Sequence, residues 1–538
     1  MRKRLAWNVN TSHQSGTEKG ERARRSPCRV AGLIGGMIAA SLLAAQSLIP
    51  ATHAAAGKTA SGEQAEGAQP RRFTTSHSGV FGGQKVRYAA VVQEHFVTDA
   101  AGKRTASIFS TSYIRTDVKQ GETRPVIFAF NGGPGSSSIW LHMGFLGPQR
   151  VDFDDAEKPA TTPPFHTLPN PDSPLDVADI VLIDPPGTGF SRVLPDGKPE
   201  QFYGVEQDAR VTIEVMRQWL RAHGRWNAPR YLVSESYGTV RAAAVAKLAA
   251  GGPMETGGMD GLTLNGIILL GQAMDMSGGA SDISVANALP SLAATACYFG
   301  KVAEGCTAKT QAEAARRFIA ERYLTALYAG AALPEAEREA VAERLSALLG
   351  LPKGAVLANN LRLSPGAFAR MLLAGENRQA GLYDARFTLP LAPNGNDPVA
   401  DDPAMGQYVP GFVAAWSRYA RETLKVTLDM TYEPIAFRSV NARWDCGFGP
   451  GVPVGRNYAT DLAVAMRRNP SLRLLVGTGY YDLVTTLGAA EYTVRHAGIP
   501  LEAVTFREYE SGHMPYLGAA SRAELAADVR AFVQGRQP

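Results

Sequence analysis

The sequence predicts an α/β fold with a mainly parallel central sheet flanked by helices. Short apolar runs alternate with longer helical stretches, and a chain of 538 residues with 45% apolar residues can bury a large core. Strands that alternate with helices in this way form parallel sheets covered on both faces. The expected strands cover residues 125–130, 179–183, 230–233 and 264–270, and the expected helices cover residues 205–223 and 238–250.

The first 75 residues differ in composition from the rest of the chain. Residues 1–54 place eight basic residues before an uncharged apolar run that ends in small residues, which is typical of an export signal. An uncleaved membrane anchor is the alternative, because the run reaches membrane-spanning length. Residues 55–75 are expected to form a flexible leader. The β-rich runs at 85–97 and 105–114 then flank a turn and predict a hairpin.

Charge and cysteine content set further limits on function. The formal net charge is +5, but residues 1–54 hold eight Lys or Arg against two Asp or Glu. A chain without this segment has no basic excess, so nucleic-acid binding is not expected. An exported chain would reach a periplasmic or extracellular compartment, where Cys297 and Cys306 are close enough in sequence to form a disulfide. The four cysteines show no metal-ligand spacing, so neither a metal nor a cofactor is expected.

The alternating pattern stops between residues 282 and 433. Helical stretches such as 309–329 and 335–349 take its place. They predict a helical insertion, which is either simple decoration or a cap over a site. The chain is thus expected to consist of a first core part at 76–281, a helical cap at 282–433 and a second core part at 434–538, which an amphipathic helix at 522–534 closes.

Ser236 lies where an apolar strand gives way to an Ala-rich helix. In α/β-hydrolases, a sharp turn of this kind exposes a nucleophilic serine in the pattern G-x-S-x-G. Ser234 and Gly238 occupy the two glycine positions, so the match is partial. Five residues of this kind occur by chance often enough that the motif needs support from the rest of the chain.

An acid and a histidine follow in the order that this fold uses. Asp482 comes after an apolar strand at 474–477, and His513 lies in a Gly/Pro-bounded loop after another strand at 503–506. In such sites the histidine takes the proton of the serine, and the carboxylate holds the histidine in the right tautomer. Alone, Asp482 would be interpreted as a turn residue and His513 as a structural one. Their joint occurrence at strand ends predicts a catalytic triad with Ser236.

Backbone amides are expected to stabilise the oxyanion of an acyl-transfer reaction. One belongs to the residue after the nucleophile, which is Tyr237, and the other to a loop after an earlier strand. The strand at 126–130 runs into Asn-Gly-Gly-Pro-Gly at 131–135, where adjacent glycines let the backbone approach a reacting carbonyl. An ordinary turn is the alternative. A second glycine-rich turn at 184–189 lacks the Gly-Lys-Ser/Thr ending of a phosphate loop and is interpreted as part of the rim of the site.

Taken together, these segments resemble the serine carboxypeptidase family of the α/β-hydrolase fold, in an exported, bacterial-type form. The resemblance is carried by residues 131–137, 184–191, 235–238 and 512–514, and more loosely by 477–482. It implies removal of single residues from peptide C-termini through an acyl-enzyme, without a metal and at acidic pH.

The resemblance also implies roles for individual residues. Gly133 matches the second oxyanion amide, and Asn131 and Glu235 match residues that help to bind the terminal carboxylate of the substrate. A glutamate can donate a hydrogen bond to a carboxylate only when it is protonated, which a neighbouring acid favours. Ala129 and Phe145 stand where the family usually has a tryptophan and a second glutamate. Recognition of the carboxylate has therefore lost two supports.

The favoured function is a serine carboxypeptidase that acts on peptides. An esterase or acyltransferase with the same triad is the first alternative, because of the two lost supports. A non-catalytic binding or protective protein is the second alternative, against which the complete triad argues. Peptides are the expected partners, with no nucleic acid and no membrane span once the signal is removed, and a homodimer is left open.

Overall fold

The computed structural model describes residues 69–119, 123–155, 159–258, 261–279, 281–391 and 397–536. The export signal expected at 1–54 and most of the leader expected at 55–75 lie outside these residues. The end of the expected leader does not, because residues 72–75 begin strand β1 (Arg72–Phe81), which pairs along its whole length with β2 (Gln84–Thr98). None of the helices in the described ranges is long and apolar enough to cross a membrane.

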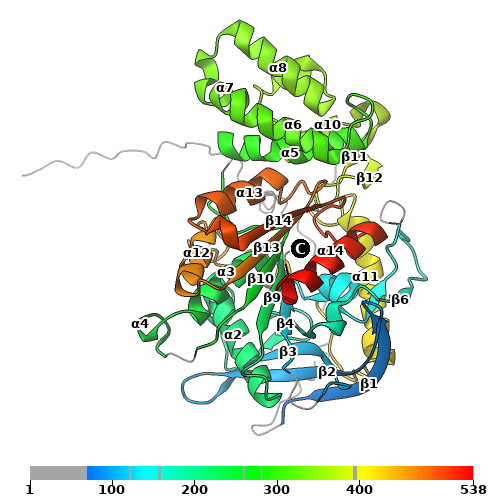
Figure 1. Cartoon of the computed structure of the whole chain (residues 1–538), viewed down its shortest axis with the longest axis vertical. Coiled ribbons are helices and arrows are strands. Elements are labelled where there is room, and N and C mark those ends of the chain that lie inside the picture. The colour runs from blue at the N-terminus through cyan, green and yellow to red at the C-terminus, as the bar shows by residue number, and fades with distance from the viewer. Residues whose placement is uncertain are drawn as a thin grey trace, which may run out of the picture. The chain divides into compact units, whose positions relative to one another are not determined.

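A ten-stranded sheet forms the centre of the described chain (Figure 1). After β1 and β2, its strands are β3 (Arg104–Arg115), β4 (Val126–Phe130), β7 (Asp179–Ile183), β8 (Arg192–Val193), β9 (Arg230–Glu235), β10 (Gly266–Leu270), β13 (Arg473–Gly479) and β14 (Val504–Tyr509). They lie in the order β1-β2-β3-β7-β4-β9-β10-β13-β14, and β8 pairs with β3. The six strands from β7 to β14 in this order are parallel, whereas β1, β2 and β3 are antiparallel. The prediction of a mainly parallel sheet is confirmed.

Helices cover both faces of this sheet, which explains why its central strands are continuous apolar runs. On one face, Val126, Phe128 and Phe130 of β4 pack with α2 (Val205–Ala222), α3 (Tyr237–Ala249) and α12 (Ala459–Arg468). On the other face, Ile127 and Ala129 pack with α1 (Ile139–Leu141), α11 (Met405–Glu422) and α14 (Ala519–Val533). Figure 1 shows α3 and α12 on one side of the sheet and α14 and α11 on the other.

The insertion begins at α5 (Asp282–Tyr298) and builds an apolar core of its own. A disulfide joins Cys297 at the end of α5 to Cys306. The further elements of the insertion are α6 (Ala308–Phe318), η4 (Ile319–Tyr323), α7 (Leu324–Ala329), η5 (Gly330–Ala332), α8 (Glu335–Leu349), α9 (Lys353–Ala358), α10 (Pro365–Met371), η6 (Ala374–Glu376), β11 (Arg378–Ala380) and β12 (Thr388–Pro390).

Helix α11 departs from the expectation of a single cap from 282 to 433. Tyr408, Phe412 and Trp416 recur every fourth residue and therefore lie on one face of the helix. This face packs into the core that covers one face of the main sheet, where Phe412 contacts Trp140 of α1 with ring centroids 5.1 Å apart. The remaining short elements are η1 (His142–Leu146), β5 (Gln149–Val151), β6 (Thr167–Pro169), η2 (Pro174–Asp176), η3 (Pro199–Gln201), α4 (Pro253–Thr256), η7 (Asn441–Arg443), α13 (Leu487–His496) and η8 (Leu501–Ala503).

Candidate active site

Ser236 occupies the turn between β9 and α3, directly after the strand ends. Its φ is 57° and its ψ is −132°, a conformation that costs a non-glycine residue about 1–3 kcal/mol. Two bonds hold it there, because the Ser236 N–H donates to the Leu270 carbonyl (3.0 Å) and its carbonyl accepts from the Thr239 N–H (2.9 Å). Gly238 is required sterically, since a Cβ there would lie 2.9 Å from the Phe130 carbonyl oxygen. A strained serine on a strand-to-helix turn is the geometry of a nucleophile elbow.

Asp482 and His513 meet beyond the carboxyl ends of β13 and β14. His513 Nδ1 lies 2.8 Å from Asp482 Oδ2, and both side chains are buried. Asp482 also accepts hydrogen bonds from the N–H groups of Val484 and Thr485 (2.8 Å each) and from the Thr485 hydroxyl (2.5 Å). These bonds fix the carboxylate and, through it, the orientation of the imidazole. His513 Nε2 is buried and has no hydrogen-bond partner among the described residues.

Ser236 and His513 both lie against the carboxyl end of β10. Leu270 accepts the Ser236 N–H, and at the next residue, Gly271, a Cβ would lie 3.0 Å from the His513 ring. Within the described chain, the Ser236 hydroxyl and His513 Nε2 make no hydrogen bond to each other. Contacts of this kind often form only when substrate is bound. The three residues predicted as a triad thus follow the carboxyl ends of three parallel strands, β9, β13 and β14.

Asp482 controls the protonation of His513. Burial disfavours the imidazolium, but the negative charge of Asp482 and its hydrogen bond outweigh this and raise the pKa of His513 above its usual 6.5. The Glu235 carboxyl acts in the same direction. A more basic imidazole accepts the proton of a serine hydroxyl more readily.

The loop at 131–135 lies against the nucleophile turn, backbone to backbone. At Gly132 a Cβ would come within 2.5 Å of the Tyr237 nitrogen, so only glycine fits. Gly133 has a φ of 105°, which also favours glycine. The amides of Gly133 and Tyr237 donate no hydrogen bond to another described residue. Two unpaired N–H groups beside a serine are the donors that an oxyanion hole needs.

A segment that follows the insertion braces this arrangement. Asn441 Nδ2 donates to the Pro134 carbonyl of the loop (2.9 Å). Trp444 Nε1 donates to the Tyr237 hydroxyl (3.0 Å), and the two rings lie edge to face. Residues 436–444 therefore contact the loop and the residue after the nucleophile.

Asn131 and Glu235 are hydrogen bonded to each other. Asn131 Nδ2 donates to Glu235 Oε1 (2.9 Å), and its Oδ1 accepts from the Leu141 N–H (3.0 Å), which fixes the orientation of the amide. Glu235 Oε2 and the Tyr516 hydroxyl are both buried and have no hydrogen-bond partner within the described ranges. Phe145 stacks on Tyr516 with ring centroids 6.2 Å apart. An aromatic pair therefore stands where the resemblance leads us to expect a second glutamate.

The protonation of Glu235 is shifted toward neutrality. Burial raises the pKa of Glu235 to about 7, against the smaller opposing effects of His513, Tyr516 and Asn131. The carboxyl group is therefore protonated at acidic pH and can donate a hydrogen bond to a carboxylate.

Three residues beside the site were not predicted from the sequence. Thr485 lies 3.0 Å from His513 Nδ1 as well as bonding Asp482, and Tyr516 lies in the same loop as His513. Both could have been predicted from the sequence, because Thr485 lies three residues from the predicted acid and Tyr516 three residues from the predicted base. Tyr383 comes from the insertion and has no such neighbour in the sequence. Its backbone carbonyl accepts a hydrogen bond from the backbone N–H of His513 (2.6 Å). Its half-buried ring lies nearly perpendicular to the His513 ring, with centroids 5.3 Å apart.

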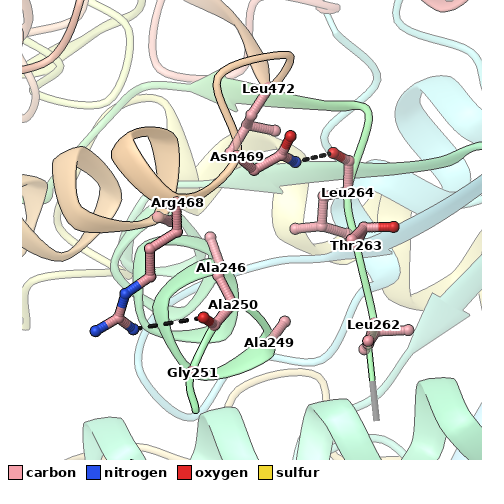
Figure 2. A pocket seen from close by; sticks show the side chains of 12 residues that line it. Ala246, Ala249, Ala250, Gly251, Leu262, Thr263, Leu264, Arg468, Asn469 and Leu472 are labelled. Atoms are coloured by element: carbon pink, nitrogen blue, oxygen red, sulfur yellow. Dashed lines mark hydrogen bonds between the residues drawn. The ribbon is translucent and has the colours of Figure 1, made fainter. Parts of the chain in front are cut away.

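The described residues offer no other candidate centre of comparable chemistry. No group of three or more His, Cys, Asp or Glu side chains in this part of the chain is arranged to hold a metal ion. Figure 2 shows a pocket that lies before β10 begins, at the opposite end of the parallel strands from Ser236. Its polar side chains are used to hold local backbone, since Asn469 donates to the Leu264 carbonyl (2.8 Å) and Arg468 to that of Ala250 (3.5 Å).

Comparisons with known proteins agree with this geometry. A family model described as serine carboxypeptidase matches residues 100–272, which include the loop at 131–135 and the nucleophile turn. Serine carboxypeptidase-like 36 of Arabidopsis thaliana is 35% identical over 92 residues, which are 17% of this chain and 17% of that protein. The match thus spans less than a fifth of the length of this relative.

A solved structure is similar over most of the chain. The crystal structure of Kex1(Δ)p, a prohormone-processing carboxypeptidase from Saccharomyces cerevisiae, has a TM-score of 0.50 and 15% sequence identity, and the similarity covers 83% of this chain and 91% of that one. At this identity the likeness shows the fold, which is that of an α/β-hydrolase.

Proposed function

We propose that the chain is a serine carboxypeptidase, which removes C-terminal residues from peptides by serine catalysis; the family model that matches residues 100–272 supports this proposal. The observation that carries the proposal is the buried contact of 2.8 Å between His513 and Asp482 beside the strained turn of Ser236. A non-catalytic protein would gain nothing from the strain and the buried, unpaired Nε2 that this arrangement includes.

In the proposed reaction, the Ser236 hydroxyl attacks the carbonyl carbon of the last peptide bond. His513 Nε2 takes the hydroxyl proton as the bond forms, and Asp482 stabilises the imidazolium. The amides of Gly133 and Tyr237 donate to the oxyanion of the tetrahedral intermediate. His513 then gives its proton to the leaving nitrogen, the C–N bond breaks, and the free amino acid departs from the acyl-enzyme.

Water completes the cycle. His513 takes a proton from a water molecule, whose oxygen attacks the acyl carbonyl and forms a second tetrahedral intermediate. When this intermediate collapses, the proton returns to Ser236 Oγ and the shortened peptide leaves with a new C-terminal carboxylate. No metal or cofactor enters the proposed scheme.

Asn131 and Glu235 are proposed to bind the terminal carboxylate of the substrate. Glu235 has a free Oε2, and its pKa of about 7 leaves it neutral at acidic pH, so it can donate to an anion there. The buried Tyr516 hydroxyl faces the Glu235 carboxyl and is a second donor at this position. Above pH 7 the charged Glu235 would repel the substrate carboxylate. The proposal therefore includes activity that is highest at acidic pH.

An esterase or acyltransferase is the second candidate function. It is favoured by Phe145, which is wholly buried and cannot pair with Glu235 as a second acid would. The same triad would then act on esters, with an alcohol as the leaving group and no carboxylate to recognise.

One experiment separates the two functions. Purified protein is incubated with N-blocked dipeptides, the matching C-terminal amides and simple esters from pH 4 to 8. A carboxypeptidase cleaves the free-acid dipeptides in preference to the amides, whereas turnover of esters without peptide cleavage would exclude this function. Ser236→Ala serves as the inactive variant and Ser417→Ala, an exposed serine on α11, as the matched control. If a phosphonofluoridate failed to label Ser236, serine catalysis itself would be excluded.

Export is part of the proposal. It is supported by the basic and apolar pattern of residues 1–54 and by the Cys297–Cys306 disulfide, since disulfides persist mainly in oxidising compartments. Fractionation of cells that express the full chain, with N-terminal sequencing of the product, tests it. Full-length protein in the reducing interior of the cell would contradict a periplasmic or extracellular location.

A further inference from the structure

A buried ion pair lies directly behind the nucleophile turn. Arg241 on α3 donates from Nε to Oδ2 of Asp208 on α2 (2.6 Å), and neither side chain is exposed to solvent. Two charges at this depth lose their hydration, and apolar residues of the same volume often stabilise a fold as well or better. The pair is also incompletely satisfied, because Asp208 Oδ1 and Arg241 Nη2 have no hydrogen-bond partner among the described residues. Stability of the core alone does not account for it.

A second nitrogen of the Arg241 side chain bonds the loop at 131–135. This loop is called the oxyanion loop below, because it carries the proposed oxyanion amide of Gly133. Arg241 Nη1 donates to the backbone carbonyl of Asn131, at 2.5 Å. The guanidinium also lies over two aromatic rings, with its carbon 5.1 Å from the centroid of Phe130 and 5.5 Å from that of Tyr237. Phe130 directly precedes the loop, and Tyr237 directly follows the nucleophile. Arg241 therefore contacts the backbone of the loop at Asn131 and the side chain of Tyr237, the two segments that carry the proposed oxyanion amides.

A small movement of the Asn131 carbonyl would change the relative positions of the two proposed oxyanion amides. This carbonyl belongs to the same peptide unit as the Gly132 N–H, and the Gly133 amide is the next unit along the chain. No side chain separates the loop from the turn, since a Cβ at Gly132 would lie 2.5 Å from the Tyr237 nitrogen and one at Gly238 would lie 3.1 Å from the Asn131 carbonyl oxygen. Rotation of the Asn131 peptide would therefore shift the Gly133 amide relative to the Tyr237 amide. Oxyanion donors act only within a narrow range of distance, so a shift of about 1 Å costs about 100-fold in rate.

We propose that Arg241 is a positioning residue that holds the oxyanion loop in register with the nucleophile turn, and that Asp208 fixes Arg241 for this purpose. The inference rests on the proposed acyl-transfer chemistry of Ser236 and holds whether the substrate is a peptide or an ester. Arg241 reaches the reaction only through the backbone of Asn131. Its removal therefore weakens stabilisation of the tetrahedral intermediate rather than binding of the substrate.

The test compares four variants of the full chain with the wild type. Arg241→Met removes the guanidinium, Asp208→Asn keeps the volume of the side chain, and the double variant removes both charges. Arg507→Met is the matched control, because Arg507 pairs with Asp528 between β14 and α14, away from the site (2.8 Å). For each protein we would measure the melting temperature, kcat and KM with 4-nitrophenyl acetate, and the affinity for phenylboronic acid. The boronate forms a tetrahedral adduct with an active serine and so reports the oxyanion site directly.

We expect Arg241→Met to lower kcat about 100-fold with KM changed by less than about twofold, and to weaken boronate binding by a similar factor. The double variant should lose no more than Arg241→Met, since the two residues act as a unit. Arg507→Met should retain wild-type kcat and boronate affinity. Should Arg241→Met fail to fold, Asp208→Asn carries the same comparison with a smaller perturbation.

Two results would overturn the inference. One is a folded Arg241→Met or Asp208→Asn variant with wild-type boronate affinity. The other is a loss of kcat that follows the loss of melting temperature alone and appears equally in Arg507→Met. A wild type that hydrolyses the ester without preferring free C-termini would contradict the peptidase proposal and leave this inference standing. A wild type that neither turns over the ester nor binds the boronate would overturn both.

Discussion

The side-chain amide of Asn131 donates a hydrogen bond of 2.9 Å to Oε1 of Glu235, which joins the loop at 131–135 to the residue before Ser236. Oε1 is thereby occupied, whereas Oε2 has no partner among the described residues. Because this carboxyl group is buried and has a pKa of about 7, its proton decides which ligand it can accept. Both substrate binding and stability should therefore depend on this proton.

Glu235→Gln should remove the dependence of substrate binding on pH. In the wild type, Glu235 is neutral and a donor below pH 7 and charged above it. We expect KM for an N-blocked dipeptide to rise about tenfold per pH unit above pH 7, which is the slope of one titrating group. Glutamine donates at every pH, so KM of the variant should stay flat from pH 6 to 8. Ester substrates, which lack a carboxylate, provide the control, and an equal rise of KM in Glu235→Gln would contradict the assignment.

The same proton should appear in the stability of the protein. The folded pKa of Glu235 is raised from 4.5 to about 7, so the folded state binds the proton more tightly than the unfolded state does. Its contribution is complete below pH 4.5 and is lost as the pH rises through 7, a difference on the order of 3 kcal/mol. Glu235→Gln should therefore lose less stability than the wild type between pH 5 and pH 8 in urea unfolding. Because Glu235 also raises the pKa of His513, both proteins are compared in a His513→Ala background, and parallel curves there would refute the shift.

Gly132→Ala should separate the oxyanion loop from the nucleophile turn. The new Cβ would lie 2.5 Å from the Tyr237 nitrogen and 2.8 Å from the Glu235 carbonyl oxygen, which are backbone atoms that cannot rotate away. We expect kcat to fall by at least about 100-fold, because both proposed oxyanion donors lose their alignment. Gly252→Ala is the matched control, since a Cβ there meets no atom within 4 Å and its φ of −88° suits any residue. Activity of Gly132→Ala near that of the control would disprove the close approach.

Removal of the disulfide should destabilise the helical insertion. Cys297 and Cys306 close a short loop of sequence separation 9, and the chain entropy that such a cross-link removes from the unfolded state corresponds to about 2–3 kcal/mol. Cys297→Ser should lower the free energy of unfolding by this amount, and dithiothreitol should have the same effect on the wild type. The variant itself should not respond to dithiothreitol. A wild type that is equally stable with and without reductant would show that the bond contributes nothing.

The sequence predicts that the candidate site residues lie together because the ends of apolar strands can be identified in it. Ser236, Asp482 and His513 each follow an apolar run, and the carboxyl ends of parallel strands meet at one edge of a sheet. The sequence also shows that Phe145 stands where the resemblance leads us to expect a glutamate. It does not show that Phe145 stacks on Tyr516, because the two residues lie far apart along the chain.

Contacts between segments that are distant in the chain could not be predicted from the sequence. Arg241 lies in an Ala-rich helix, where a solvated arginine is the ordinary expectation, and only the packing of α2 on α3 brings it to Asp208. The aromatic spacing of α11 indicates an amphipathic helix but does not say that it packs into the main core rather than into the core of the insertion. The start of β1 at Arg72 was concealed by composition, since its alternating polar side chains resemble those of a leader.

The hydrogen bond from Asn441 to the Pro134 carbonyl spans 307 residues of chain, and that from Trp444 to Tyr237 spans 207. These bonds give the order in which a working centre can arise during biosynthesis. A nascent chain that has passed Ser236 still lacks the segment that contacts the loop at 131–135, as well as His513, the proposed base. The proposed site therefore cannot be complete before the segment from Asn441 to His513 has been synthesised and has folded against the nucleophile turn.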